Sequence, residues 1–133
     1  MKSISKLKKE LDKWFSLYIR LRSSENGLVQ CFTCGVVKHY KSGMQCGHFQ
    51  SRRFMATRYD ERNQIQCIKC NMFEQGMQWQ FGLNLDAKYG EGTAEEMQFK
   101  ARQIQKFSRV DYEDKITYYK SLVENLKKEK GIE

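Results

Sequence analysis

The sequence predicts an α+β fold in which a small central β unit is flanked by an N-terminal helix and by C-terminal helices. Three observations predict it: both ends carry apolar residues at helical spacing, the middle consists of short segments broken by Gly, Ser and Asn, and paired cysteines border that middle. A length of 133 residues suffices for a single domain with one modest core. We divide the chain into an N-terminal helix (1–27), a central core (28–75) and a helical C-terminal part (76–133).

The N-terminal helix is expected over residues 4–22. Ser3 precedes it as an N-cap residue, and Asn26-Gly27 ends the segment. Apolar residues recur along it at alternating steps of three and four, at Ile4, Leu7, Leu11, Trp14, Tyr18 and Leu21. That spacing forms a narrow apolar seam, which suits contact with one partner helix.

The central segment has the pattern of short strands. Strands are expected over residues 28–31 (LVQC), 36–40 (VVKHY) and 44–49 (MQCGHF), each bounded by residues that favour turns. The KSG sequence at 41–43 is expected to form the turn between the last two.

Helical spacing returns after the last cysteine. A helix over about 76–89 ends at Gly90, which is a suitable C-cap. Thr93 and Glu96 have the spacing of a capping box for a second helix, over 94–106. The aromatic residues of the first of these helices are expected in the core: Trp79, Phe81 and Tyr89.

The last helix, over 110–129, carries a second narrow seam. Its apolar positions are Tyr112, Ile116, Tyr119, Val123 and Leu126. The first and last helices either pack on each other within the chain, or each meets its copy in a homodimer. The sequence leaves both arrangements open.

Basic residues are concentrated in the first half of the chain. Lys and Arg number 24 against 16 Asp and Glu, which gives a net charge of +8. Residues 1–30 and 31–75 each hold seven basic against three acidic residues, whereas residues 76–133 hold ten of each. The excess therefore coincides with every cysteine and both histidines, and this favours a nucleic-acid partner over a merely solubilising surface.

Membrane and secreted proteins are excluded as classes. No apolar run approaches the roughly 18 residues of a membrane span, and the charged N-terminus lacks the apolar stretch of a signal peptide. Five cysteines without an export signal indicate a reducing compartment. We therefore expect a cytoplasmic protein.

Two Cys-x2-Cys pairs are the strongest chemical signal. Cys31 and Cys34 form the first pair, and Cys67 and Cys70 form the second after 32 intervening residues. Each short turn presents two thiolates toward one point, which suits tetrahedral Zn²⁺. Four thiolates leave no open coordination position, so this zinc is expected to be structural and to staple a segment with little core of its own.

His48 lies inside this cysteine-bounded segment, followed by two arginines. A neutral imidazole there can deprotonate a water for attack on a phosphodiester. Arg52 or Arg53 can hold the adjacent phosphate through paired hydrogen bonds. A divalent cation, Mg²⁺ or Mn²⁺, would stabilise the leaving oxygen, and Asn71 or Glu74 can supply the oxygen ligands that it needs.

These residues also carry a resemblance to a known family. Cys-x2-Cys, then QCGHFQSR, then TRYDERNQIQCIKCN, then Phe81 through Leu85 to Tyr89-Gly90 resembles the phage lambda NinG (Rap) recombination protein family. The resemblance covers roughly residues 10–125. That family is similar to HNH-type, ββα-metal nucleases such as phage endonuclease VII, and it is described as acting on Holliday junctions and other branched DNA.

The resemblance implies a role for each matching residue. His48 takes the general-base position, Asn71 that of an asparagine metal ligand, and Asn63 that of the middle asparagine, which holds the loop carrying the histidine. Glu61, within the DERN run, assists the metal or positions the base. The four cysteines match the zinc ligands, and the basic stretch would contact DNA through Arg52, Arg53, Arg58 and Arg62.

One position departs from the pattern of endonuclease VII-like enzymes. They carry an aspartate metal ligand directly before the histidine, whereas this chain, like the NinG family, has Gly47. A second ligand must then come from elsewhere, and the candidates in order of preference are Glu74, Glu61 and Asp60.

The resulting expectation is a ββα-metal, HNH-like endonuclease that cleaves branched DNA in phage recombination, acting as a homodimer in the host cytoplasm. Two alternatives stay open: an HNH enzyme that nicks duplex DNA, and a zinc-stabilised DNA-binding module without catalysis. The last explains the basic half of the chain and the four cysteines, and Gly47 is its best argument, but it leaves His48, Arg52 and Asn71 unexplained.

Overall fold

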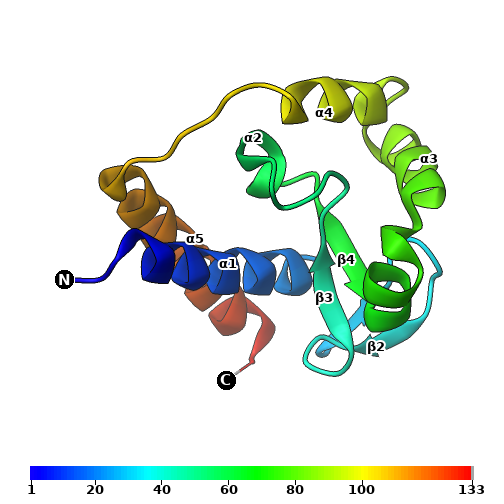
Figure 1. Ribbon diagram of the computed structural model, residues 1–133. Helices are drawn as coiled ribbons and strands as arrows, with labels where there is room; N and C mark the ends of the chain where they lie inside the picture. Colours follow the sequence, from blue (N-terminus) through cyan, green and yellow to red (C-terminus); the bar gives the residue numbers. More distant parts are fainter. Residues whose placement is uncertain (133) are drawn as a thin grey trace.

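The computed structural model describes residues 1–132 and has helices at both ends around a small β-containing centre (Figure 1). The elements, in chain order, are α1 (Ile4–Leu21), β1 (Leu28–Gln30), β2 (Val37–His39), β3 (Met44–Gly47), α2 (Met55–Arg58), β4 (Gln64–Cys67), the π-helical turn η1 (Lys69–Phe73), the 3-10 turn η2 (Gln75–Met77), α3 (Gln78–Tyr89), α4 (Thr93–Ala101) and α5 (Arg109–Lys130). The α+β class is therefore confirmed.

The four strands form two separate antiparallel pairs. β1 pairs with β2, with Leu28 opposite His39, and β3 pairs with β4, with Met44 opposite Cys67. The turn at 41–43 therefore connects strands of different sheets. β4 was not expected, because two of its four residues are polar glutamines; both are buried.

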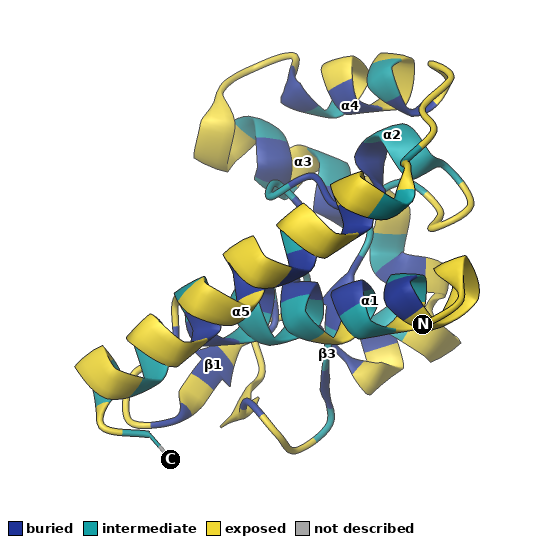
Figure 2. Ribbon diagram, turned by 90° about the vertical axis from the view of Figure 1, so that its left-hand side faces the viewer, coloured by how far each residue is buried: buried dark blue, intermediate teal, exposed yellow. Residues whose placement is uncertain are grey.

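α1 and α5 lie side by side and form the main helical contact (Figures 1 and 2). The buried residues of α5 are four of the five expected ones, and Leu126 is partly buried against the same core. The seam of α5 thus packs on α1 within the chain. A homodimer, if it forms, has to use a different surface.

The apolar face of α1 is rotated from the one expected. Its buried residues follow steps of four, at Leu7, Leu11, Phe15 and Ile19, with Leu21 at the end. Trp14 and Tyr18 are only partly buried, and Ile4 is exposed. The rotation arises because α1 contacts β3 and β4 as well as α5, which requires a face wider than a two-helix seam.

A second, smaller core joins α3 and α4 to the centre. Phe49, Phe81, Leu85 and Met97 pack together, so the expected burial of Phe81 is confirmed. Trp79 is 80% exposed, however, and Tyr89 is 43% exposed. The expectation that these two aromatic residues belong to the core was wrong, because the face of α3 that packs on this core is narrow.

The capping box lies on a different helix from the one expected. Gly92 is the N-cap residue of α4, and the hydroxyl of Thr93 donates to the carbonyl of Gly90 instead of capping the helix. α4 also ends at Ala101 rather than at 106. A complete capping box is present at the start of α5, where Ser108 and Asp111 bind each other's backbone N–H groups.

Within residues 1–132, no helix has both the length and the apolar character needed to cross a membrane.

Candidate metal centre and active-site pocket

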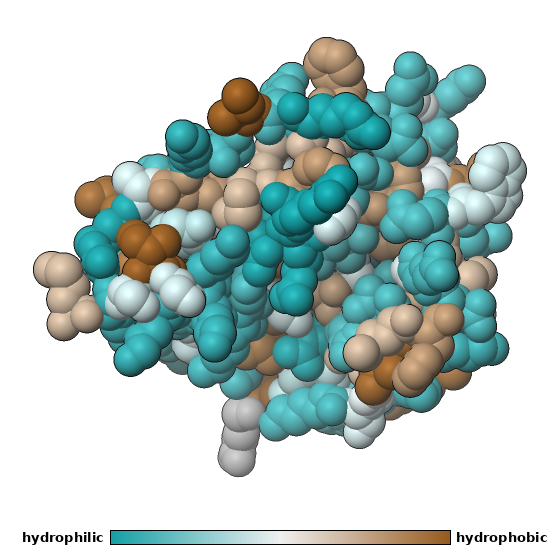
Figure 3. All heavy atoms as spheres, in the orientation of Figure 1, coloured by the Kyte–Doolittle hydropathy of each residue, from teal (hydrophilic) through white to brown (hydrophobic). Residues whose placement is uncertain are grey.

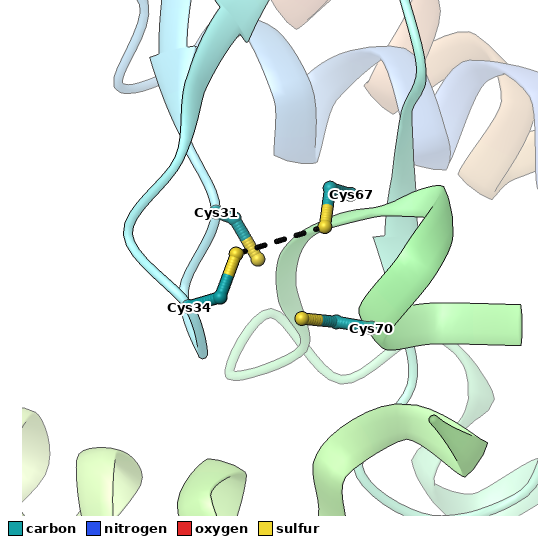
Figure 4. Close-up of side chains that lie close together, drawn as sticks. All are labelled: Cys31, Cys34, Cys67 and Cys70. Carbon is teal, nitrogen blue, oxygen red and sulfur yellow. Dashed lines mark hydrogen bonds between the residues drawn. The ribbon is translucent and has the colours of Figure 1, made fainter. Parts of the chain in front are cut away.

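The four paired cysteines converge on one point. Cys31 and Cys34 come from the loop after β1, whereas Cys67 ends β4 and Cys70 lies in η1; Figure 4 shows the four side chains turned toward one another. Their sulfur atoms all lie within 4.8 Å of one another, and the Sγ atoms of Cys34 and Cys67 are 3.7 Å apart. Tetrahedral Zn²⁺ with Zn–S bonds of about 2.3 Å needs sulfur atoms about 3.8 Å apart, so the four residues fit a structural zinc.

The loop around Cys31 is built to stabilise a thiolate. Burial alone would raise the pKa of Cys31, but hydrogen bonds from the Thr33 hydroxyl and from backbone N–H groups outweigh it and lower the pKa to about 6. Gly35 has φ +82°, which lets its N–H donate to the carbonyl of Cys31 and close the turn. Because zinc binds the thiolate form, this turn favours metal binding.

Next to this centre, a cavity of about 470 Å³ collects residues from three parts of the chain. α1 contributes Asp12, Phe15 and Ser16, and η1 contributes Asn71 and Met72. β3 and the loop after it contribute the remaining residues: Gln45, Cys46, His48, Ser51 and Arg52. Of the expected site residues, the fold therefore brings His48, Arg52 and Asn71 together.

His48 directly follows β3 and faces this pocket with a defined tautomer. Its Nε2 atom lies 3.0 Å from the carbonyl oxygen of Arg58. Since a carbonyl oxygen can only accept, Nε2 carries the proton, and the neutral ring has its free lone pair on Nδ1. Burial, together with the positive charge of Arg52, lowers the pKa of His48 to about 4, so the ring is neutral at neutral pH.

Asn63 is fully buried and ties the loop that carries His48 to α2. Its Oδ1 accepts a hydrogen bond from the N–H of Phe49 (3.1 Å). Its Nδ2 donates to the carbonyl oxygens of Thr57 (2.9 Å) and Arg58 (3.4 Å). The side chain thus holds the residue after His48 and also the carbonyl that binds the ring.

The absence of a side chain at Gly47 has a steric cause. A Cβ atom at this position would lie 2.7 Å from the Cγ and Cδ atoms of Gln66, which is closer than real Cβ contacts. Gln66 is itself fixed, because its Nε2 donates to the Thr33 hydroxyl and to the carbonyl of Gly76. An aspartate therefore cannot stand at position 47 without displacing the buried glutamine.

The four expected DNA-contacting arginines differ in how freely they can reach a ligand. Arg52 and Arg53 are exposed, and neither side chain forms an ion pair within residues 1–132. Arg62 pairs with Asp60 and with a glutamate of α4. Arg58 is buried, and its guanidinium donates two hydrogen bonds to the carboxylate of Asp12. The position of Arg58 therefore does not support a contact with DNA.

The expected acidic residues lie outside the pocket. Both carboxylate oxygens of Glu61 accept hydrogen bonds from tyrosine hydroxyls, those of Tyr18 on α1 and Tyr119 on α5, at 3.1 and 3.0 Å. Glu61 therefore ties the two long helices together. The carboxylate of Asp60 accepts hydrogen bonds from Arg62 and Lys100. Glu74 is exposed and does not line the cavity.

Asn71 does line the cavity, with its amide oriented by a neighbour. Its Nδ2 donates to the side-chain oxygen of Gln45 at 2.7 Å, which leaves Oδ1 as the acceptor of that amide. Among residues 1–132, Asp12 on α1 supplies the only carboxylate that lines the cavity. Sequence reasoning missed Asp12 because it stands 36 positions before His48, and only tertiary packing brings α1 to this site.

Comparison with known proteins identifies a family. The family model described as Bacteriophage Lambda NinG protein matches residues 1–129. No curated protein and no solved structure matches the chain. Because the match spans almost the whole sequence, the chain belongs to the bacteriophage lambda NinG family.

Proposed function

We propose that this protein is a metal-dependent endonuclease that hydrolyses phosphodiesters in branched DNA, such as Holliday junctions, during phage recombination in the host cytoplasm. The observation that carries the proposal is the fixed tautomer of His48 in a pocket that also holds Arg52 and Asn71. The substrate class, branched DNA, comes from the resemblance to the NinG family. The concentration of positive charge in residues 1–75 supports a polyanionic substrate.

The order β3, β4, η1 supports a ββα-metal unit as the catalytic core. His48 follows β3, Asn63 precedes β4, and Asn71 lies in the helical turn after β4. These are the positions of the histidine and the two asparagines in HNH-type enzymes, and the observed bonds of Asn63 suit its proposed role of holding the histidine loop. The zinc site fixes β4 and η1 at the base of this unit.

His48 is proposed as the general base. Its Nε2–H stays on the carbonyl of Arg58, and Nδ1 accepts the proton of the attacking water. A base with a pKa of about 4 is weak in the free protein. A phosphodiester bound in the pocket adds a negative charge near the ring, which offsets the effect of nearby positive charges, such as that of Arg52, on the pKa of His48.

The pocket offers one free oxygen donor to a hard divalent cation such as Mg²⁺ or Mn²⁺, the Oδ1 atom of Asn71. Asn71 would hold it through Oδ1, with phosphate oxygens completing the coordination, and Glu74 could join only after a rotation of its exposed side chain. When bound, such an ion neutralises charge on the leaving oxygen. Arg52 and Arg53 are free to hold the flanking phosphates.

A homodimer is proposed because symmetric cleavage of a four-way junction needs two active sites. The seams of α1 and α5 are occupied within the chain, so they do not supply its interface.

Cleavage of a labelled four-way junction tests the proposal, with a linear duplex of the same sequence as the control. Divalent ion is omitted by desalting, because a chelator would also remove zinc. Paired nicks on the junction, dependent on Mg²⁺ or Mn²⁺ and lost in His48→Ala, are expected. Equal cutting of both substrates would indicate a general nicking enzyme, and binding without cutting would indicate a DNA-binding module. The zinc content of His48→Ala should stay at one per chain, because no cysteine is changed.

A further inference from the structure

Asp12 is the centre of a hydrogen-bonded clamp between α1 and α2. Its Oδ1 accepts from Arg58 Nε (3.0 Å) and from the Tyr59 hydroxyl (2.7 Å), and its Oδ2 accepts from Arg58 Nη2 (2.6 Å). Side-chain exposure is 23% for Asp12 and 10% for Arg58. A bidentate ion pair that is largely buried fixes both the position and the orientation of the guanidinium.

The clamp reaches the site residues through Arg58. The third guanidinium nitrogen, Nη1, donates to the carbonyl oxygen of Arg52 at 2.7 Å. The backbone carbonyl of Arg58 binds Nε2 of His48 at 3.0 Å. One arginine therefore holds the backbone that carries Arg52 and also the acceptor that sets the tautomer of His48.

We propose that Asp12 is a positioning residue: by holding Arg58 it fixes the tautomer and orientation of His48 and the backbone of Arg52. The catalytic consequence rests on the proposed function, whereas the effect on the ring of His48 does not. Asn63 binds the same carbonyl more weakly, at 3.4 Å, and cannot replace the guanidinium at Arg52.

The substitution Asp12→Asn tests this role, with Glu10→Gln as the matched control. Both remove one negative charge from α1, but Glu10 pairs with Lys2 at the surface and does not line the cavity. The ring ¹⁵N shifts of His48 report its tautomer directly. We expect a single Nε2–H tautomer in the wild type and in Glu10→Gln. In Asp12→Asn we expect a mixture of tautomers and a lowered pKa of His48, because the carboxylate of Asp12 and the hydrogen bond to the carbonyl of Arg58 both raise that pKa in the wild type.

The activity and metal readouts separate positioning from direct metal binding. For a positioning residue, kcat for junction cleavage falls about 10- to 100-fold in Asp12→Asn, with KM and the affinity for Mn²⁺ nearly unchanged. Lost Mn²⁺ affinity with an unchanged His48 spectrum would overturn the proposal, as would a wild-type spectrum in a folded variant. If the protein cuts no DNA, the spectra still decide. If Asp12→Asn does not fold, the same spectra and kinetics are measured on Arg58→Lys. A lysine at this position cannot bind Asp12 and the carbonyl of Arg52 together.

A second inference comes from an independent feature, an exposed apolar surface on η1. Ile68, Met72 and Phe73 form this η1 surface, with exposures of 36%, 61% and 75%. Figure 3 shows apolar atoms gathered at this place at the lower right of the molecule. Met72 also lines the pocket of His48, so the surface adjoins the proposed site.

The charge around the η1 surface favours DNA over a second copy of the chain. Lys69 is exposed on the same turn, Glu74 is exposed directly after Phe73, and Arg52 is exposed at the pocket that Met72 lines, so these three side chains leave one net positive charge. In a dimer through this surface, both copies would contribute residues from the first 75, which hold all the excess positive charge, so the two faces would repel each other. DNA would neutralise that charge, and unpaired bases have flat faces that stack on aromatic side chains.

We infer that the η1 surface stacks on unpaired bases next to the cleavage site, which would favour branched over continuous DNA. This rests on the proposed function for its biological meaning, but binding alone tests it. Phe73→Ala, made in the non-cleaving His48→Ala protein, should weaken binding to a three-way junction with unpaired bases at least about fivefold and leave duplex binding unchanged.

The matched control is Phe99→Ala, because Phe99 is 72% exposed on α4 and lies outside the η1 surface. 2-Aminopurine at the unpaired position gives a direct readout, since stacking quenches its fluorescence. Equal loss of affinity for both DNAs, or unchanged quenching in Phe73→Ala, would overturn the inference. Conversion of a dimer to a monomer by Phe73→Ala in analytical ultracentrifugation would overturn it in favour of a second copy.

Discussion

Acidification should destabilise the protein through His48 over a defined pH range. The pKa of His48 is about 4 in the folded state, against about 6.5 for an unperturbed histidine. Between pH 6.5 and pH 4, His48 binds a proton in the unfolded chain but stays neutral in the folded chain. The contribution of the neutral ring is therefore fully present above pH 6.5 and is lost progressively as the pH falls to 4.

The two pKa values fix the magnitude. At 1.36 kcal/mol for each unit between them, the loss at pH 4 reaches about 3 kcal/mol, which corresponds to a fall in Tm of about 10 °C for a domain of this size. This is an upper value, because one edge of the ring faces the pocket and is partly solvated. Asp12 and Asp60 have lowered pKa values, so they lose their contributions below pH 4, outside this range.

Chemical unfolding of the wild type and His48→Gln at several pH values measures the effect. The glutamine amide can still donate to the carbonyl of Arg58 but takes up no proton. Protonation of the zinc thiolates affects both proteins equally, so it cancels in the difference. Between pH 7 and pH 4, the free energy of unfolding of the wild type should fall by about 3 kcal/mol more than that of His48→Gln. Parallel curves would refute the reasoning, because they would show that His48 is solvated in the folded protein.

Three further perturbations have defined outcomes. Cys67→Ser should abolish zinc binding, measured as metal per chain, and should unfold the central core together with DNA binding. Asn63→Ala should lower the free energy of unfolding in urea by about 2–4 kcal/mol, because it leaves buried backbone groups without partners; a loss below about 1 kcal/mol would contradict the assigned bonds. The logarithm of DNA affinity should fall linearly with the logarithm of salt concentration, and Arg52→Ala and Arg53→Ala should each reduce the slope by about one. A slope unchanged by both substitutions would mean that other residues hold the phosphates.

Features set by local sequence could be predicted, and features set by tertiary contacts could not. The long helices and the cysteine cluster follow from spacing alone, since periodicity and short turns are local. The rotated face of α1 was missed because a seam pattern does not show that the helix also packs on strands. β4 was missed because Gln64 and Gln66 are buried by specific hydrogen bonds rather than by apolar character.

The same distinction applies to the pocket. His48, Arg52 and Asn71 were identified because each stands beside a recognisable local motif. Asp12 has no such neighbour, and its role depends on α1 crossing the site. Glu61 was assigned to the site from its place in the DERN run, but the fold directs its carboxylate to the interface of α1 and α5.

Gln66 connects the zinc site to the absence of an aspartate beside His48. Its Nε2 binds the hydroxyl of Thr33, which in turn contacts Cys31, so the side chain braces the first cysteine turn against β4. The same side chain fills the space that a Cβ at Gly47 would need. A chain that uses a buried glutamine for this purpose cannot also carry a carboxylate at position 47. The carboxylate of Asp12, which does line the pocket, is bound to an arginine. The site thus has little negative charge of its own, which suits a pocket whose remaining oxygen ligands would come from the phosphates of bound DNA.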